Sequence, residues 1–155
     1  MNINLKKLAS FLEEANQNTY ANKDAKRSDS LRPESQDYHF KKEGLTYHDT
    51  YFGAKNFIGE EIVYENGKPV WGMNYYGFLT GDDAKHKEVY IFLRKALMQK
   101  YNDIIPVRGP KEFSDDNLKY VNSAEGGLEK FTGKEKILAD EKSIYECFYH
   151  GGFIE

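Results

Sequence analysis

A stretch of 21 residues that occurs twice limits what this chain can fold into. Shifted by 74 positions, Phe57–Gly77 aligns with Phe131–Gly151 without a gap, and six of the 21 columns are identical. Four more columns are conservative, whereas about one match is expected by chance, so we interpret the pattern as an internal duplication. Asn66–Gly67 lies in the middle of the first copy and is a strong hairpin signal, so each copy is predicted to be a β-hairpin.

Residues outside the repeat predict the other elements. Apolar residues at helical spacing predict a helix over about 4–17 and a second helix that begins at Asp82–Asp83. Alternating side chains predict strands at 38–42, 45–52 and 118–122, and the second hairpin over 128–153. Residues 106–117 are predicted to be a loop, and the polar segment 22–36 is predicted to be either disordered or a lid.

These elements predict an α+β fold made of two similar halves. Each half contains a helix, a strand and a hairpin, with repeat one over about 4–79 and repeat two over about 82–154. The simplest assembly is one antiparallel sheet of six to seven strands, with both helices on one face and a pseudo-two-fold axis between the halves. The 155 residues are expected to form a single domain over 1–155, because this length suffices to bury a core.

The charge and cysteine content argue against several classes of function. The formal net charge is −3, whereas a nucleic-acid-binding surface needs clustered Lys and Arg, so no direct nucleic-acid binding is expected. Cys147 is the single cysteine and the four histidines lack metal spacing, so neither a disulfide, a metal nor a cofactor is predicted. No stretch approaches the roughly 20 apolar residues of a membrane span. Met1–Ala15 does not resemble a signal peptide, so a cytoplasmic location is expected.

Strand pairing in the first hairpin selects the candidate site residues. With a two-residue turn, positions whose numbers sum to 133 lie opposite each other. The face expected to lie under the helices carries Ile58, Ile62, Trp71, Met73 and Tyr75. The other face places Glu61 and Glu135 at matching positions, and a buried carboxylate without a partner is costly. We expect both glutamates to be charge anchors of a groove near the axis, lined by Phe57, Asn74, Tyr76, Phe148 and His150.

A groove of this kind suits a cationic or amphipathic organic ligand, through ion pairing and cation–π contact. Several alternatives stay open. The glutamates can have a structural role, bonded to backbone or to lysine, and a one-residue bulge would exchange the two faces. A glutamate pair could carry out hydrolysis, as in glycosidases, and a flat apolar face could bind another protein. In strand 45–52, Tyr47, Asp49 and Tyr51 share a face that is either a binding surface or has no function.

Further motifs run through nearly the whole chain. They are Thr19–Ala21, Asp49–Gly53, Phe57-x-Gly59-x-Glu61, Lys68–Gly77, Arg108–Pro110 and Phe131-x-Gly133-x-Glu135. With them the chain resembles a bacterial family of uncharacterised domains, found alone or appended to a helix-turn-helix DNA-binding domain. The resemblance implies a sensor or effector-binding role and supplies no catalytic residue. The first predicted helix begins within a few residues of Met1, so no DNA-binding part is expected before it.

Overall fold

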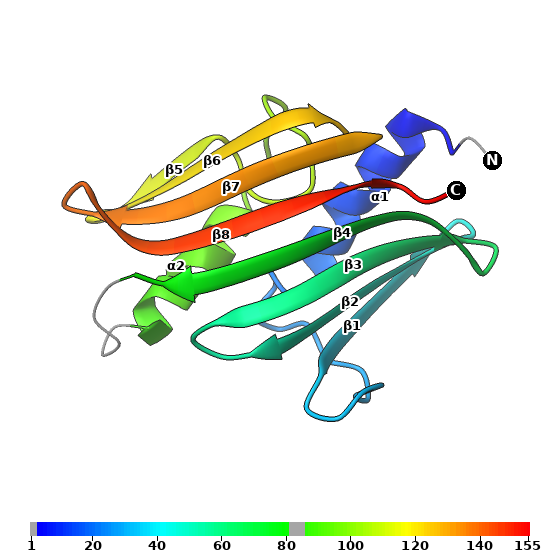
Figure 1. Ribbon diagram of the computed structural model, residues 1–155, viewed down its shortest axis with the longest axis horizontal. Coiled ribbons are helices and arrows are strands. Elements are labelled where there is room, and N and C mark those ends of the chain that lie inside the picture. The colour runs from blue at the N-terminus through cyan, green and yellow to red at the C-terminus, as the bar shows by residue number, and fades with distance from the viewer. Residues whose placement is uncertain (1–2, 81–85) are drawn as a thin grey trace.

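The computed structural model describes residues 3–80 and 86–155, which are organised around one open antiparallel sheet (Figure 1). Within these residues the strands are β1 (Gln36–Lys42), β2 (Leu45–Gly53), β3 (Phe57–Glu65), β4 (Lys68–Leu79), β5 (Glu112–Asp115), β6 (Leu118–Gly127), β7 (Lys130–Ala139) and β8 (Lys142–Phe153). Their order in the sheet is β1-β2-β3-β4-β8-β7-β6-β5, so β4 and β8 are central and β1 and β5 are the edges. Helix α1 (Leu5–Asn18) precedes β1, and α2 (His86–Leu97) precedes β5.

The α+β class with one antiparallel sheet and two helices is confirmed, but the strand count of six to seven is wrong. Among the described residues the sheet has eight strands, because Glu112–Asp115 within the predicted loop 106–117 forms β5. This strand has four residues and pairs only with β6, so it has too few positions to show a clear alternation. Its Phe113 packs against Phe92 of α2 with ring centroids 5.6 Å apart. The expected helix start at Asp82–Asp83 lies outside the described residues.

Both helices lie on the same side of the sheet, α1 against β1 and β2 and α2 against β5 and β6 (Figure 1). The predicted first helix is confirmed with bounds shifted by one residue. Asn4 caps it, because its side-chain oxygen accepts hydrogen bonds from the backbone N–H groups of Lys6 and Lys7 at 2.9 and 3.1 Å. The buried stripe of α1 is Leu8, Phe11, Leu12 and Ala15, and that of α2 is Val89, Phe92, Leu93, Ala96 and Leu97.

A bulge in the first hairpin corrects the expected faces. Glu61 pairs with Met73, and the register shifts only beyond Val63, so opposing positions before the shift sum to 134 rather than 133. Glu61 and its neighbours on alternate positions therefore lie under the helices, together with Trp71 and Met73. Ile58, expected to be covered, is 56% exposed on the outer face. The Asn–Gly turn alone does not reveal an extra residue inside the strand.

The second hairpin has the same irregularity. Its register shifts between Ile137 and Leu138, and Glu135 pairs with Cys147 on the helix side. The largest buried side chain, Trp71, lies on the helix side of β4 and donates its indole N–H to the carbonyl of Leu128 at 3.0 Å. The interior between sheet and helices is therefore rich in aromatic side chains that carry hydrogen-bonding groups.

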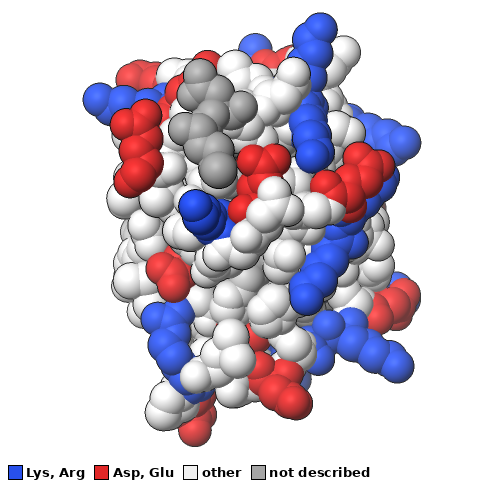
Figure 2. All heavy atoms as spheres, turned by 90° about the vertical axis from the view of Figure 1, so that its right-hand side faces the viewer, with Lys and Arg blue, Asp and Glu red and all other residues white. Residues whose placement is uncertain are grey.

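The surface carries charges of both signs. Lys and Arg side chains are interspersed with Asp and Glu over the end of the molecule seen in Figure 2, in keeping with the net charge of −3. Neither helix in the described part of the chain has the length and apolar character needed to cross a membrane.

Candidate functional site

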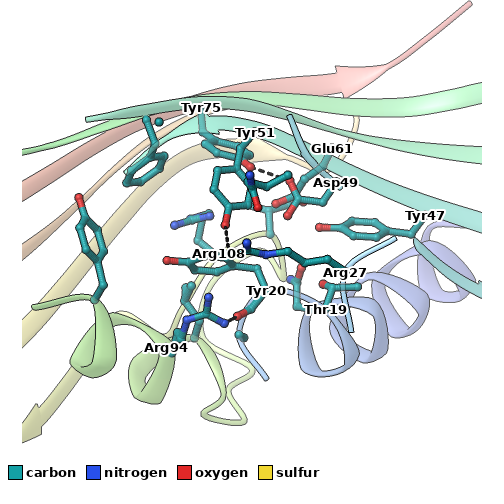
Figure 3. Close-up of a pocket in the computed structure, with 18 of the residues that line it drawn as sticks. Thr19, Tyr20, Arg27, Tyr47, Asp49, Tyr51, Glu61, Tyr75, Arg94 and Arg108 are labelled. Atoms are coloured by element: carbon teal, nitrogen blue, oxygen red, sulfur yellow. Dashed lines mark hydrogen bonds between the residues drawn. The ribbon is translucent and has the colours of Figure 1, made fainter. Parts of the chain in front are cut away.

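A cavity of about 360 Å³ lies between the sheet and the helices (Figure 3). Its walls come from the end of α1 and the segment after it, from β2, β3 and β4, from α2, and from the loop before β5. The buried part of the lining includes Thr19, Ala21, Tyr47, Asp49, Tyr51, Glu61, Tyr75, Leu97, Val107 and Arg108. The exposed end includes Arg27, Gly53 and Ala54, so the cavity opens where the segment after α1 passes the end of β2.

Two neighbouring carboxyl groups form the floor of this cavity. Asp49 and Glu61 are paired residues of β2 and β3, and both are buried. Asp49 accepts a hydrogen bond from the hydroxyl of Tyr75 at 2.6 Å. The hydroxyl-bearing side chain of Tyr47 lies beside Glu61 and favours its ionised form, but Oε2 of Glu61 has no partner among the described residues. A buried carboxyl oxygen without a donor is uncommon in folded proteins and requires an explanation.

Burial changes the protonation of this pair. Desolvation, followed by the charge of Asp49, raises the pKa of Glu61 to about 8, although the positive charge of Arg108 opposes the shift. Desolvation also raises the pKa of Asp49 to about 6, against the hydrogen bond from Tyr75. At neutral pH Glu61 is therefore mainly a neutral acid, and Asp49 carries the negative charge.

Aromatic rings and arginines form the walls. The ring of Tyr20 meets that of Tyr51 edge-on at 5.7 Å, and the guanidinium of Arg94 lies 4.0 Å from the centre of the Tyr20 ring. Arg27 donates to the hydroxyl of Tyr51 at 3.3 Å, and Figure 3 shows both arginines below the floor carboxyls, toward the helices. Among the described residues neither Arg27 nor Arg94 forms an ion pair, so this side of the cavity carries uncompensated positive charge.

Glu135 does not reach this cavity, so the shared groove expected from the sequence is wrong in geometry. Its carboxylate is fully buried and accepts from Arg108 Nη2 at 2.5 Å and Nε at 3.1 Å. The hydroxyls of Tyr120 and Tyr145 donate to it at 2.5 and 2.8 Å. Four donors satisfy one carboxylate, which leaves it no direct contact to offer a ligand. Of the two repeated glutamates, only Glu61 faces open space.

The other expected site residues divide between the two faces of the sheet. Phe57 lines the cavity. Tyr76 and Phe148 lie on the outer face and are 45% and 47% exposed. Asn74 and His150 are exposed on the same face, where they pair with each other across β4 and β8. The bulge explains the division, because it moves the odd positions of β3 and the even positions of β4 to opposite faces. A binding role for these four outer residues stays a prediction.

Several cavity residues escaped the sequence reasoning. The common face of Tyr47, Asp49 and Tyr51 was a signal for part of the lining. No sequence pattern near Arg27 or Arg94 indicates that these residues line the cavity. Their position depends on how the helices and the segment after α1 pack on the sheet. Within residues 3–80 and 86–155 no group of three or more His, Cys, Asp or Glu is positioned to hold a metal ion.

Comparisons with known proteins identify the family and leave its function open. A family model described as a domain of unknown function (DUF5680) matches residues 49–154, which run from the second half of β2 to the end of β8 and include the carboxyls of the cavity floor. Searches of curated proteins and of solved structures returned no match. The chain belongs to the DUF5680 family of domains of unknown function.

Proposed function

We propose that the chain is a small-molecule-binding module and that its ligand is a cationic or amphipathic organic molecule held in the cavity. The observation that carries this proposal is the Glu61 carboxyl, which is buried at the cavity floor with one oxygen unpartnered among the described residues. An unsatisfied buried polar group costs about 1–3 kcal/mol. A ligand that donates a hydrogen bond to this oxygen recovers that free energy.

The size and lining of the cavity support an organic ligand. Its volume of about 360 Å³ lies at the lower end of the roughly 300–1,000 Å³ usual for ligand pockets. The rings of Phe57, Tyr20, Tyr51 and Tyr75 present faces and edges on which an apolar or cationic group packs favourably. Arg27 and Arg94 supply a second, positive pole for an amphipathic molecule.

The protonation of Glu61 determines how a cation binds. The free protein holds this carboxyl neutral at pH 7, because its pKa is about 8. A positive charge placed beside it favours the ionised form, so a cation displaces the proton and then forms a buried ion pair. Binding of a cation is therefore expected to release a proton and to strengthen as the pH rises from 6 to 8.

A thermal-shift screen tests the proposal. Wild type and Glu61→Gln are heated with cationic, neutral and anionic metabolites and drugs, and Glu60→Gln serves as control. Glu60 is the adjacent residue, lies on the outer face and pairs with Arg32 at 3.0 Å. We expect cationic compounds to raise the melting temperature of wild type and of the control, and not that of Glu61→Gln. Hits that bind Glu61→Gln equally well, or a panel without cationic hits, would contradict the proposal.

An acid–base enzyme is a second candidate, favoured by the separation of two pKa values. Asp49 and Glu61 are neighbours whose pKa values lie near 6 and 8, and such a pair can supply a base and an acid at neutral pH. This pair replaces the glutamate pair expected from the sequence, because Arg108 neutralises Glu135. Turnover of chromogenic glycosides and esters by wild type, absent in both Asp49→Asn and Glu61→Gln, would support this candidate. Equal turnover by all three proteins would exclude it.

The resemblance to domains appended to bacterial helix-turn-helix regulators supports a sensor role. In that setting, occupation of the cavity would be the signal passed to a partner domain.

We also infer that the two halves arose by duplication. The mirrored strand order and the helix that precedes the strands of each half support this inference.

A further inference from the structure

Glu61 and Glu135 occupy equivalent places in the two halves of the sheet. Glu61 on β3 pairs with Asp49 on β2, and Glu135 on β7 pairs with Asn122 on β6. Both glutamates are buried on the helix side. The second half of the sheet is therefore an internal reference that shows which groups satisfy a carboxylate in this position.

The residues around the two pairs correspond closely. Tyr75 donates its hydroxyl to Asp49 at 2.6 Å, and Tyr149 donates its hydroxyl to Asn122 at 2.8 Å. These tyrosines are themselves partners across β4 and β8. The residues next to each glutamate therefore correspond between the halves. The two sites differ in the hydrogen-bond donors that reach the glutamate carboxyl group.

The carboxylate of Glu135, which is the reference, has a complete set of hydrogen-bond donors. Arg108 binds Glu135 through two nitrogens, at 2.5 and 3.1 Å, in the bidentate manner that suits a planar guanidinium. Tyr120 and Tyr145 add one hydroxyl each. The guanidinium carbon of Arg108 also lies 5.5 Å from the centre of the Tyr75 ring, so the cation packs near an aromatic face.

Glu61 lacks most of this set. Tyr47 takes the place beside Glu61 that Tyr120 takes beside Glu135, and it favours the ionised form of Glu61. Trp71 stands in the place of Tyr145 and gives its N–H to a backbone carbonyl instead. One carboxyl oxygen of Glu61 consequently has no partner among the described residues.

The bidentate guanidinium is the other missing component. Two arginines, Arg27 and Arg32, follow α1 in the first half. Arg27 lies at the exposed end of the cavity and donates to Tyr51, and Arg32 pairs with Glu60 on the outer face. The space in front of Glu61, which an arginine side chain fills in front of Glu135, is part of the cavity. The first half therefore has the carboxyl group and the room for a guanidinium, without the guanidinium.

We propose that the ligand of this cavity carries a guanidinium or amidinium group that binds Glu61 as Arg108 binds Glu135. The inference rests on the proposed binding function and specifies the chemistry of the ligand's cationic end. A planar fork with parallel N–H groups can bond both oxygens of one carboxylate, whereas an ammonium is a compact point charge that donates along diverging directions. The flat cation also fits the aromatic lining, as the position of Arg108 near Tyr75 illustrates.

Matched probes separate the two kinds of cation. Benzamidine, benzylamine and benzyl alcohol share a benzene ring and differ in carrying an amidinium, an ammonium or no charge. Their dissociation constants are measured by titration calorimetry at pH 7.5 on the full chain, with wild type, Glu61→Gln, Glu61→Asp and the control Glu60→Gln. We expect benzamidine to bind wild type and the control at least about tenfold more tightly than benzylamine, because only the amidinium makes two charge-assisted bonds.

The variants show whether the preference originates at Glu61. Glu61→Gln should remove the preference for benzamidine, and Glu61→Asp, which keeps a carboxyl group but withdraws it by one methylene, should reduce it. Equal or weaker binding of benzamidine than of benzylamine, with both lost in Glu61→Gln, would overturn this inference and leave the proposed function standing. Binding of neither cation, or binding that survives Glu61→Gln, would overturn both.

Discussion

Replacing Glu61 by Gln should stabilise the protein at neutral and higher pH, although the residue is buried and lies at the candidate site. In the folded protein the pKa of Glu61 is about 8, against 4.5 for an unperturbed glutamate. At pH 7 the unfolded chain ionises this carboxyl and the native state mainly does not. The difference of 2.5 pH units between 4.5 and 7 corresponds to about 3 kcal/mol of lost stability. Glutamine is neutral in both states and avoids this loss.

The direction of this pH dependence follows from the number of protons that the folded and unfolded states bind. Between pH 4.5 and about 8 the folded state binds more protons at Glu61 than the unfolded state, so the stability of wild type falls as the pH rises through this window. Asp49, with a pKa of about 6, also lowers the stability as the pH rises, by a smaller amount. This contribution is present in Glu61→Gln as well. The groups that act on Glu61 are Asp49, Arg108, Tyr47 and Glu135. The two proteins should therefore have similar stability near pH 4.5 and diverge progressively above it.

Thermal unfolding at pH 5, 6, 7 and 8 measures the divergence. For a chain of this size about 3 kcal/mol corresponds to roughly 6–12 °C in melting temperature, well above the error of the method. Glu60→Gln is the control, because its side chain lies on the outer face and pairs only at the surface with Arg32. A Glu61→Gln curve that runs parallel to wild type, or lies below it at pH 8, would refute the reasoning. Glu61 would then be ionised and partnered in the native state.

Three further predictions follow from single contacts. Glu135→Gln should destabilise the protein by about 3–5 kcal/mol in urea unfolding, because it leaves the buried guanidinium of Arg108 uncompensated; an unchanged midpoint would contradict this. Gly59→Ala should cost about 1–3 kcal/mol in the same assay, because an added Cβ would overlap the hydroxyl of Tyr75 and the backbone carbonyl of Thr50; a neutral effect would contradict this close packing. Tyr75→Phe should raise the pKa of Asp49 above its value of about 6, because the lost hydrogen bond favours the ionised form. An NMR titration of the Asp49 carboxyl carbon measures this, and a constant or lower pKa would contradict it.

The class of the fold was predictable because its signals are local. The stripe on α1 repeats at helical spacing, and Asn66–Gly67 predicts a tight turn between two alternating strands. The short strand β5 was missed because its four residues pair only at the edge of the sheet. The register of the hairpins was missed because a single bulged residue changes every later pair.

The site was partly predictable for the same reason. Glu61 and Phe57 stood out as repeated positions of one strand, and both line the cavity. The expectation for Glu135 failed because its partner Arg108 lies 27 positions away in a loop whose path depends on the whole fold. The cavity itself arises from the imperfect fit of helices on a sheet, which no local pattern describes.

The two edge strands of the sheet determine whether molecules of this protein can associate by strand pairing. An open sheet exposes unpaired backbone groups along its outermost strands, which is where chains add to each other in aggregates. Here one edge strand, β5, has only four residues. The other is partly capped, because the N–H of Ser28 donates to the carbonyl of Asp37 at 2.9 Å, and it ends in the exposed pair Lys41 and Lys42. A short edge strand and a charged, partly capped one both disfavour the addition of a further strand, so the eight-stranded layer is protected from growing in either direction.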